Sequence, residues 1–284
     1  MPLSPPPSSQ TDLLLLRDLL EKKTGLYIAD EKAGRLEEPF AELCSIHRRG
    51  AGEILRAIDL GDADGRRYLD RVVAAIATNE TYFFRIPAHF ETLKNYLLPE
   101  IIERKKLAGE KTLRIWSAGC STGEEPYSVA IFLLEHFPEL LSWQVRIIAT
   151  DIDLDALGRA GQGVYRSWSF RGVAPELKRK YWQALPDDCY RIDERARALV
   201  QFSPLNLESE GYPAPANGTD DLDIIFCRNV TIYFRPHTVK KVLRRFHDCL
   251  AAGGFLLTGA AEYSREAYRD FAARAFPETV IYQK

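Results

Sequence analysis

The residues with the clearest chemical potential follow a short apolar run, LRIWSA (113–118), which leads into GCSTGEEPYS. A strand that enters a turn with Gly119 and Gly123 and then a helix is typical of nucleoside sites, because small residues let the backbone approach the ligand. The full G-x-G-x-x-G pattern is absent, and Glu124 and Glu125 stand where a pyrophosphate would bind. These carboxylates favour a sulfonium nucleoside, S-adenosylmethionine, over NAD or ATP. An ordinary strand-to-helix turn of an α/β protein is the alternative.

A second candidate is Asp151, which ends the next predicted strand in IIATDID. A carboxylate at that strand end can accept hydrogen bonds from both ribose hydroxyls. Helix capping is an equally acceptable role for Asp151 on local grounds. Asp153 and Asp155 are better interpreted as the N-cap and first turn of the following helix.

Two further polar segments flank the predicted sheet. Arg228 and Asn229 follow the apolar run LDIIFC (222–227), and side chains at such a strand end open into the ligand crevice, although they can also simply anchor the loop. The segment ATNETYFFR (77–85) joins the helical region to the sheet. Its aromatic run is expected in the core, although a sulfonium would also gain cation–π attraction from it.

Alternating short apolar runs and helices predict an α/β fold with a buried, mostly parallel sheet. Gly253 and Gly254 are expected to stop the last helix. The predicted strands cover residues 113–118, 145–150, 199–204, 222–227, 255–260 and 279–284. The predicted helices include 92–107, 124–136 and 237–251.

The chain divides into three predicted parts. Residues 1–10 are a Pro/Ser-rich disordered tail, and residues 11–77 have the three- and four-residue apolar spacing of a small helical domain. Residues 78–284 carry the sheet, with a poorly fitting, Tyr-, Trp- and Arg-rich segment at about 163–197 that we assign to an inserted β-subdomain.

Composition narrows the function. A net charge of −2 and a pI near 6.3 give no general attraction to nucleic acid or to an anionic membrane. Five cysteines without a CxxC motif argue against disulfides or a zinc knuckle, and no apolar stretch reaches membrane-spanning length. We therefore expect a cytoplasmic protein without a metal site. The five histidines, each expected at the surface or at a helix cap, are His47, His89, His136, His237 and His247.

Several motifs together resemble one family. TNETYFFR, WSAGCSTGEEPYSVA, ATDID, FSPLNL, IFCRNVTIYF and GGFLLTGAAE occur in the order seen in the CheR family of chemotaxis receptor methyltransferases, from about Thr78 to the C-terminus. The resemblance implies a Rossmann-like class I methyltransferase sheet with an all-helical N-terminal domain and a small inserted β-subdomain. It also implies methyl transfer from S-adenosylmethionine to protein glutamate, with S-adenosylhomocysteine as product.

The same resemblance assigns site residues. It implies that the side chains nearest the transferred methyl and the incoming carboxylate are Arg85 and Tyr233. It implies that the cofactor is bound by Asn79, Thr81, Arg85, Glu124, Asp151, Asn206, Leu207, Arg228 and Asn229.

The expected partner is the cytoplasmic domain of a chemoreceptor or another protein with methylatable glutamates, with possible recruitment to membrane receptor arrays. In the family a basic helix commonly faces the acidic receptor, but residues 31–50 mix both signs of charge, so steering would be weaker here. The alternatives are a regulatory module that binds S-adenosylmethionine or S-adenosylhomocysteine, and a methyltransferase for another acceptor. We expect a monomer.

Overall fold

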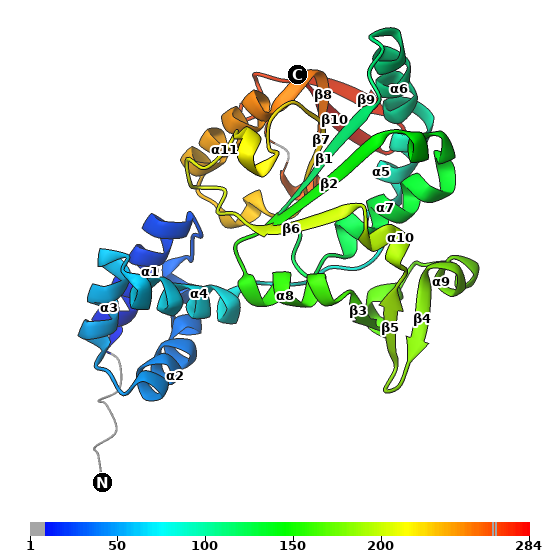
Figure 1. Cartoon of the computed structure of the whole chain (residues 1–284). Helices are drawn as coiled ribbons and strands as arrows, with labels where there is room; N and C mark the ends of the chain where they lie inside the picture. Colours follow the sequence, from blue (N-terminus) through cyan, green and yellow to red (C-terminus); the bar gives the residue numbers. More distant parts are fainter. Residues whose placement is uncertain (1–8, 263, 265) are drawn as a thin grey trace.

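The computed structural model describes residues 9–262, 264 and 266–284. A helical unit, a large sheet domain and a small sheet lie side by side, with the small sheet projecting from the large domain away from the helical unit (Figure 1). Most of the predicted tail lies outside the described residues. Among the described residues, no helix combines the length and apolar character that a bilayer span requires.

The amino-terminal unit is all-helical and has its own core, which includes Leu16, Leu20, Phe40 and Ile54. Ser9 caps the first helix by accepting a hydrogen bond from the Asp12 N–H at 3.2 Å. The helices are α1 (Gln10–Thr24), the short 3-10 helix η1 (Asp30–Leu36), α2 (Glu37–His47), α3 (Ala51–Leu60) and α4 (Ala63–Ile76).

The large sheet has seven strands in the order β6-β2-β1-β7-β8-β10-β9. The first five are parallel, and β10 and β9 are antiparallel additions at one edge. The strands are β1 (Thr112–Ala118), β2 (Gln144–Asp151), β6 (Val200–Pro204), β7 (Leu222–Cys227), β8 (Leu250–Thr258), β9 (Ala272–Phe276) and β10 (Thr279–Gln283). The predicted mostly parallel α/β fold is therefore confirmed, although β9 was not predicted.

Helices cover both faces of this sheet because its strands are apolar on both sides. In β1, Leu113 and Ile115 belong to the core on one face, whereas Trp116 and Ala118 belong to the core on the other. The helices of this domain are α5 (Pro87–Thr92), the π-helix η2 (Leu93–Leu97), α6 (Leu98–Leu107), α7 (Glu124–His136), the 3-10 helix η3 (Pro138–Ser142), α8 (Leu154–Gln162) and α11 (Pro236–Cys249).

The segment between α8 and β6 forms a three-stranded antiparallel sheet in the order β3-β5-β4. Phe83 from the segment before α5 packs into it, stacked on Phe170 with ring centroids 5.3 Å apart. The elements are β3 (Val164–Arg166), η4 (Ser167–Phe170), α9 (Pro175–Tyr181), β4 (Trp182–Leu185), β5 (Cys189–Ile192) and α10 (Glu194–Arg197).

The predicted helix stop at Gly253 and Gly254 was wrong. Helix α11 already ends at Cys249, and both glycines lie inside β8. They are needed there because the pairing of β8 with β7 shifts register near Leu222, and a Cβ at Gly254 would lie 2.8 Å from the Leu222 carbonyl oxygen. A glycine pair at the end of a helical pattern can therefore mark a strand irregularity.

Candidate functional site

The site begins at the turn that leaves β1. The N–H groups of Gly119 and Cys120 both donate to the Thr150 carbonyl at the end of β2, at 2.8 and 2.9 Å. Gly119 has φ +77°, and an added Cβ would overlap Cγ2 of Val230. Glycine is therefore required where three strand ends meet.

Asp151 ends β2, as predicted, and faces this turn. Its Oδ2 accepts the Ser121 N–H at 2.7 Å and its Oδ1 accepts the Asp153 N–H at 2.9 Å. Each oxygen keeps room for another hydrogen bond. Burial raises the pKa of Asp151 against the opposing effect of these backbone donors. Asp153 caps α8 through the Asp155 and Ala156 N–H groups, also as predicted.

Asn79 is bound to the same group. Its Oδ1 accepts the Ser121 hydroxyl at 2.7 Å and its Nδ2 donates to Asp153 Oδ2 at 2.8 Å. The structure thus brings Asn79 beside Asp151, although the two lie in segments far apart in the sequence.

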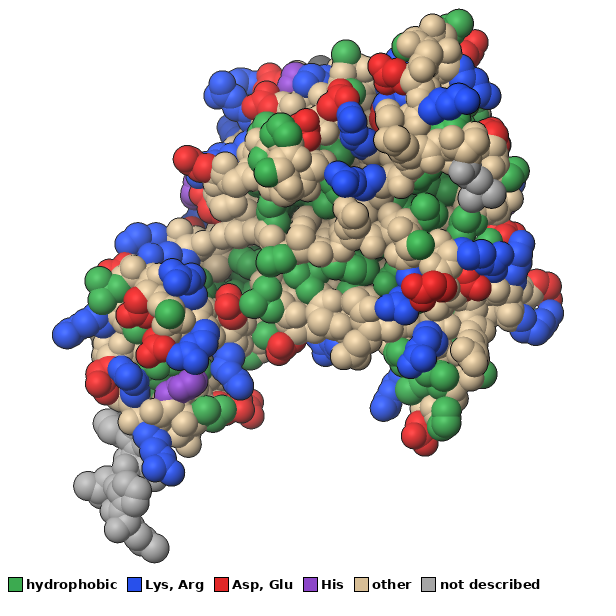
Figure 2. Space-filling view, viewed as in Figure 1, with side chains coloured by type: hydrophobic (Ala, Val, Ile, Leu, Met, Phe, Trp, Pro, Cys, Tyr) green, Lys and Arg blue, Asp and Glu red, His purple; other side chains and the backbone are tan. Residues whose placement is uncertain are grey.

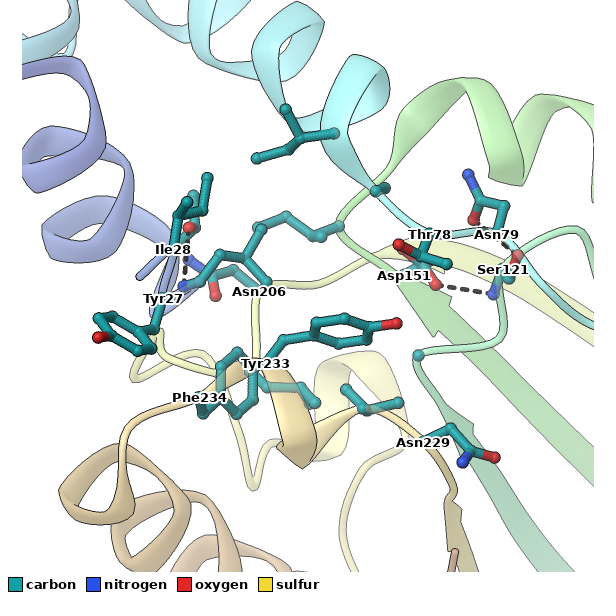
Figure 3. A pocket seen from close by; sticks show the side chains of 18 of the residues that line it. Tyr27, Ile28, Thr78, Asn79, Ser121, Asp151, Asn206, Asn229, Tyr233 and Phe234 are labelled. Atoms are coloured by element: carbon teal, nitrogen blue, oxygen red, sulfur yellow. Dashed lines mark hydrogen bonds between the residues drawn. The ribbon is translucent and has the colours of Figure 1, made fainter. Parts of the chain in front are cut away.

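A pocket opens in front of these groups, between the sheet and the helical unit (Figure 3). Its walls are largely apolar, with Ile76, Ile152 and Val230 among them. Figure 3 shows the Tyr233 ring projecting across it with the hydroxyl toward the Asp151 side. The predicted residues that line it are Asn79, Asp151, Asn206, Leu207, Asn229 and Tyr233.

The helical unit supplies one wall of this pocket, which the sequence did not predict. Leu26 pairs with Phe234 in an isolated antiparallel bridge, and the Tyr27 N–H donates to the Tyr233 carbonyl at 2.8 Å. The Asn206 amide also donates to the Lys23 carbonyl at 2.8 Å. The unpredicted lining residues from this unit are Thr24, Leu26, Tyr27, Ile28, Arg35, Ile76 and Ala77.

A second pocket adjoins the first and shares Asn229 and Tyr233 with it. Exposed Glu80 and Ile232 also line it. It is the polar half of the site, because two arginines line it. The predicted residues here are Thr81, Arg85, Arg228, Asn229 and Tyr233.

Arg228 forms the base of the second pocket. Its side chain is 3% exposed, and its guanidinium pairs with Glu125 and donates to the Arg85 carbonyl. Glu125 in turn accepts the Ser117 hydroxyl at 2.6 Å. The Arg85 guanidinium donates to the Glu80 carbonyl at 2.7 Å and lies over the Tyr82 ring, 5.7 Å from its centroid. Arg228 is therefore fixed, whereas Arg85 has unused donors.

His89 lies near Arg228, and its predicted position at the surface or at a helix cap was wrong. It is 2% exposed. Burial, helped by the nearby Arg228 charge, lowers its pKa from 6.5 to about 3. The imidazole therefore stays neutral beside the buried guanidinium.

The backbone around both pockets adopts costly conformations. Phe84 and Ile86, on either side of Arg85, have φ +57° and +63°, and Asn229 and Ser121 have φ +61° and +49°. Positive φ at residues other than glycine costs on the order of 1–3 kcal/mol and clusters at functional sites. Here the positive φ values set the direction of the polar side chains that lie at the strand ends.

Glu124 does not line either pocket. Its carboxylate turns toward the small sheet and accepts hydroxyls from Thr122 at 2.7 Å and Ser169 at 2.9 Å. Burial raises its pKa. Glu125, which the sequence analysis paired with it, is the carboxylate that reaches the second pocket. The predicted cofactor contact of Glu124 remains a prediction.

The loop after β6 is anchored from within the core. The Tyr212 hydroxyl donates to the Leu207 carbonyl at 2.7 Å, and Tyr212 packs edge-on against Trp116. Asn206 Oδ1 accepts the Glu208 N–H at 2.9 Å. These contacts hold Asn206 and Leu207 at the pocket wall.

The residues present fit an adenosyl cofactor. Asp151 retains acceptor capacity for hydroxyl groups, and Asn229 Oδ1 is buried without a partner among the described residues. Aromatic contact in the first pocket comes from Tyr27, Tyr233 and Phe234, whereas Tyr82, Phe83 and Phe84 line neither pocket. Over the described chain, no cluster of three or more His, Cys, Asp or Glu could hold a metal ion.

Comparison with known proteins gives consistent matches. Residues 79–279 match the family described as CheR methyltransferase, SAM binding domain. A chemotaxis protein methyltransferase from Borreliella burgdorferi is 33% identical over 90% of this chain and 89% of that protein. Chemotaxis protein methyltransferase 2 from Vibrio cholerae is 32% identical over 97% and 93%, and chemotaxis protein methyltransferase 1 from Pseudomonas aeruginosa is 34% identical over 90% and 91%.

Proposed function

The chain belongs to the CheR family of S-adenosylmethionine-dependent methyltransferases, and from that premise we propose that it methylates glutamate side chains in the cytoplasmic domain of a chemoreceptor. The product would be a glutamyl methyl ester used in sensory adaptation, together with S-adenosylhomocysteine. Another protein with accessible glutamates is the alternative acceptor.

One observation carries this proposal. The first pocket is largely apolar and contains Asp151, a carboxylate that could bind ribose hydroxyls. It adjoins a second pocket lined by arginines, and Tyr233 lines both. The first suits an adenosine group. The second has the cationic donors that suit carboxylates. A cofactor in the first and an acidic side chain in the second would meet at Tyr233 and Asn229.

The residues would divide the work of binding. Asp151 accepts ribose hydroxyls, Asn79 keeps the Ser121 turn in place, and Asn206 and Leu207 close the adenine side. Arg228 and Asn229 hold the junction of the two pockets. Glu124 contributes, on our proposal, by fixing the turn from behind, because its hydroxyl partners are protein groups.

When bound, S-adenosylmethionine supplies an electrophilic methyl group on a sulfonium. A glutamate side chain, with a reference pKa of about 4.3, is already ionised at neutral pH, so this site needs no general base. Catalysis is then mainly alignment, which can lower a barrier by about 7–11 kcal/mol.

Arg85 and Tyr233 are our candidates for that alignment. Arg85 has free guanidinium donors at the second pocket and would hold a carboxylate by charge-assisted hydrogen bonds. Tyr233 would orient the nucleophilic oxygen and, together with Thr81, help to exclude water.

Recognition of the acceptor is expected to depend little on long-range charge. Figure 2 shows Lys and Arg side chains interspersed with Asp and Glu over the amino-terminal helices. Such a mixed surface gives weak steering. We propose that the enzyme acts in the cytoplasm as a monomer and reaches membrane receptor arrays by binding its substrate.

Incubation with methyl-labelled S-adenosylmethionine and membranes from the source cell tests this function. Base-labile label on receptor glutamates, located by peptide mapping, is the expected result. Base-stable label on RNA, DNA or a metabolite would contradict it. Tight binding of S-adenosylhomocysteine without any transfer would indicate a regulatory module.

A further inference from the structure

Glu262 is a buried acidic residue that ends the motif GGFLLTGAAE, lines neither pocket and has so far been given no role. It ends the short 3-10 turn η7 (Ala260–Glu262) just after β8, and it is 6% exposed. The turn lies at the carboxyl end of the sheet, and η7 contacts η6 (Thr231–Tyr233). A buried carboxylate in this place needs compensating donors.

Three of the five donors to Glu262 are backbone N–H groups of one loop, residues 229–231. Glu262 Oε2 accepts the N–H groups of Gly259 at 2.6 Å and Asn229 at 2.7 Å. Its Oε1 accepts the N–H groups of Val230 at 2.9 Å and Thr231 at 2.8 Å, and the Thr231 hydroxyl at 2.9 Å. Converging N–H groups of this kind form an anion-binding nest. The side chain thus fixes three consecutive residues.

The three residues that Glu262 holds, 229–231, belong to the loop that carries the predicted site residues. Arg228 precedes them, Asn229 is the first of them, and Tyr233 follows two residues after the last. Asn229 has φ +61°, a left-handed conformation that asparagine tolerates better than most residues, and the hydrogen bond from its N–H to Glu262 holds it there. The carboxylate therefore stabilises the backbone conformation from which the site residues project.

The fit around Glu262 is tight. A Cβ at Gly259 would lie 2.8 Å from Glu262 Oε2 and 3.2 Å from the Asn229 nitrogen. The glycine is needed so that the carboxylate can reach the loop from the end of β8. Gly259→Ala should therefore disturb the same contacts without removing the charge.

We propose that Glu262 is a positioning residue for methyl transfer: its carboxylate binds the N–H groups of residues 229–231 and thereby sets Asn229 and Tyr233 at the junction of the two pockets. The expected effect on kcat rests on the proposed function, because it requires methyl transfer to the receptor. The expected effect on S-adenosylhomocysteine affinity does not depend on which acceptor is methylated.

Glu262→Gln tests it with minimal change in shape. A carboxylate only accepts, whereas the amide must turn its NH₂ toward at least two N–H donors in either orientation. We expect kcat to fall about 10–100-fold and S-adenosylhomocysteine to bind about tenfold more weakly in calorimetry. The acceptor KM should change little. Amide exchange at Asn229, Val230 and Thr231 should become faster.

Asp223→Asn is the matched control. Asp223 is a fully buried carboxylate at the opposite end of the neighbouring strand β7, far from both pockets in the register of the sheet. At a temperature where both variants are folded, Asp223→Asn should keep kcat and S-adenosylhomocysteine affinity within about twofold of wild type.

Two results would overturn the proposal. One is a Glu262→Gln variant with wild-type kcat and nucleoside affinity, and the other is an equal loss in Asp223→Asn. A wild-type enzyme with no turnover on receptor would refute the proposed function instead. In that case the nucleoside affinities and amide exchange of the two variants still decide the role of Glu262.

Discussion

The two ends of strand β7 each lie beside a buried carboxylate, and the two carboxylates are compensated in different ways. At the amino end, Asp223 forms an ion pair with Lys105 at 2.9 Å and accepts the Arg114 N–H at 2.9 Å. At the carboxyl end, Glu262 is held by backbone N–H groups. The first arrangement uses a cationic side chain to neutralise a charge in the core.

The second arrangement leaves side chains free. Because peptide N–H groups satisfy Glu262, the Asn229 and Tyr233 side chains remain available for a ligand, and Asn229 Oδ1 has no partner among the described residues. The comparison teaches that burial of charge alone does not mark a functional site. A functional site is marked by unused hydrogen-bonding capacity together with a positive φ.

Removing the cation at the amino end should have the largest effect. Lys105→Met removes the closer of the two cations beside Asp223 and leaves only Arg104 at 3.7 Å, so the free energy of unfolding at pH 7 should fall by about 3 kcal/mol in urea titration. Nucleoside affinity and kcat of the folded fraction should not change. The exposed neighbour substitution Lys106→Met is the control, and a loss as small as the control's would show that the ion pair does not anchor β7.

Arg85→Ala should have the opposite signature at the carboxyl end. Loss of the cationic donor that we propose holds the acceptor carboxylate should lower kcat/KM for the receptor about 10²–10³-fold. Stability should change by less than about 1 kcal/mol, because Arg85 forms one hydrogen bond to a backbone carbonyl. Arg179→Ala on the exposed face of α9 is the control. Wild-type turnover by Arg85→Ala would remove this residue from the mechanism.

The buried, neutral His89 should make the free energy of unfolding depend on pH. Its pKa is lowered from 6.5 to about 3 in the folded protein, so the unfolded state binds the extra proton as pH falls below about 6.5. Between pH 7 and pH 5 this group alone should cost about 2 kcal/mol of stability.

His89→Gln removes that group and should make the stability profile flatter by the same amount, measured by urea unfolding at each pH. The exposed His237→Gln should leave the wild-type slope unchanged. Parallel profiles for wild type and His89→Gln would mean that the histidine titrates normally.

The smallest predicted effect concerns Asp151. Asp151→Asn keeps the side-chain shape but turns an amide group toward either the Ser121 or the Asp153 N–H. We expect S-adenosylhomocysteine affinity to fall about tenfold in calorimetry, with no comparable change in stability. An unchanged affinity would exclude Asp151 from the nucleoside site.

Residues at strand ends were predictable from sequence because apolar runs give the strands and parallel strands end at one edge. Asp151, Arg228 and Asn229 follow this logic and lie together in the structure. The direction of Glu124 and Glu125 was not predictable. Adjacent helical residues differ by about 100° in direction, and only the tertiary packing decides which one faces the ligand.

Local sequence patterns also could not predict that the amino-terminal unit lines the first pocket. Leu26 and Tyr27 meet Phe234 and Tyr233 across some two hundred residues of chain, and nothing in their local spacing signals this pairing. Glu262 had a signal in the sequence, because it is the last residue of the motif GGFLLTGAAE, just past an apolar strand. Its five hydrogen bonds depend on loop geometry that sequence does not encode locally.

The bridge between Leu26 and Phe234 constrains how such enzymes can be recombined. A chimera that exchanges the amino-terminal helices to change the proposed receptor preference would also replace one wall of the first pocket, the proposed nucleoside site. Junctions placed after Ile28 would keep the native strand pairing, whereas junctions near residue 77 would force a foreign segment against Tyr233. Receptor choice and donor affinity are therefore expected to change together in such hybrids unless the native Lys23–Ile28 segment is retained.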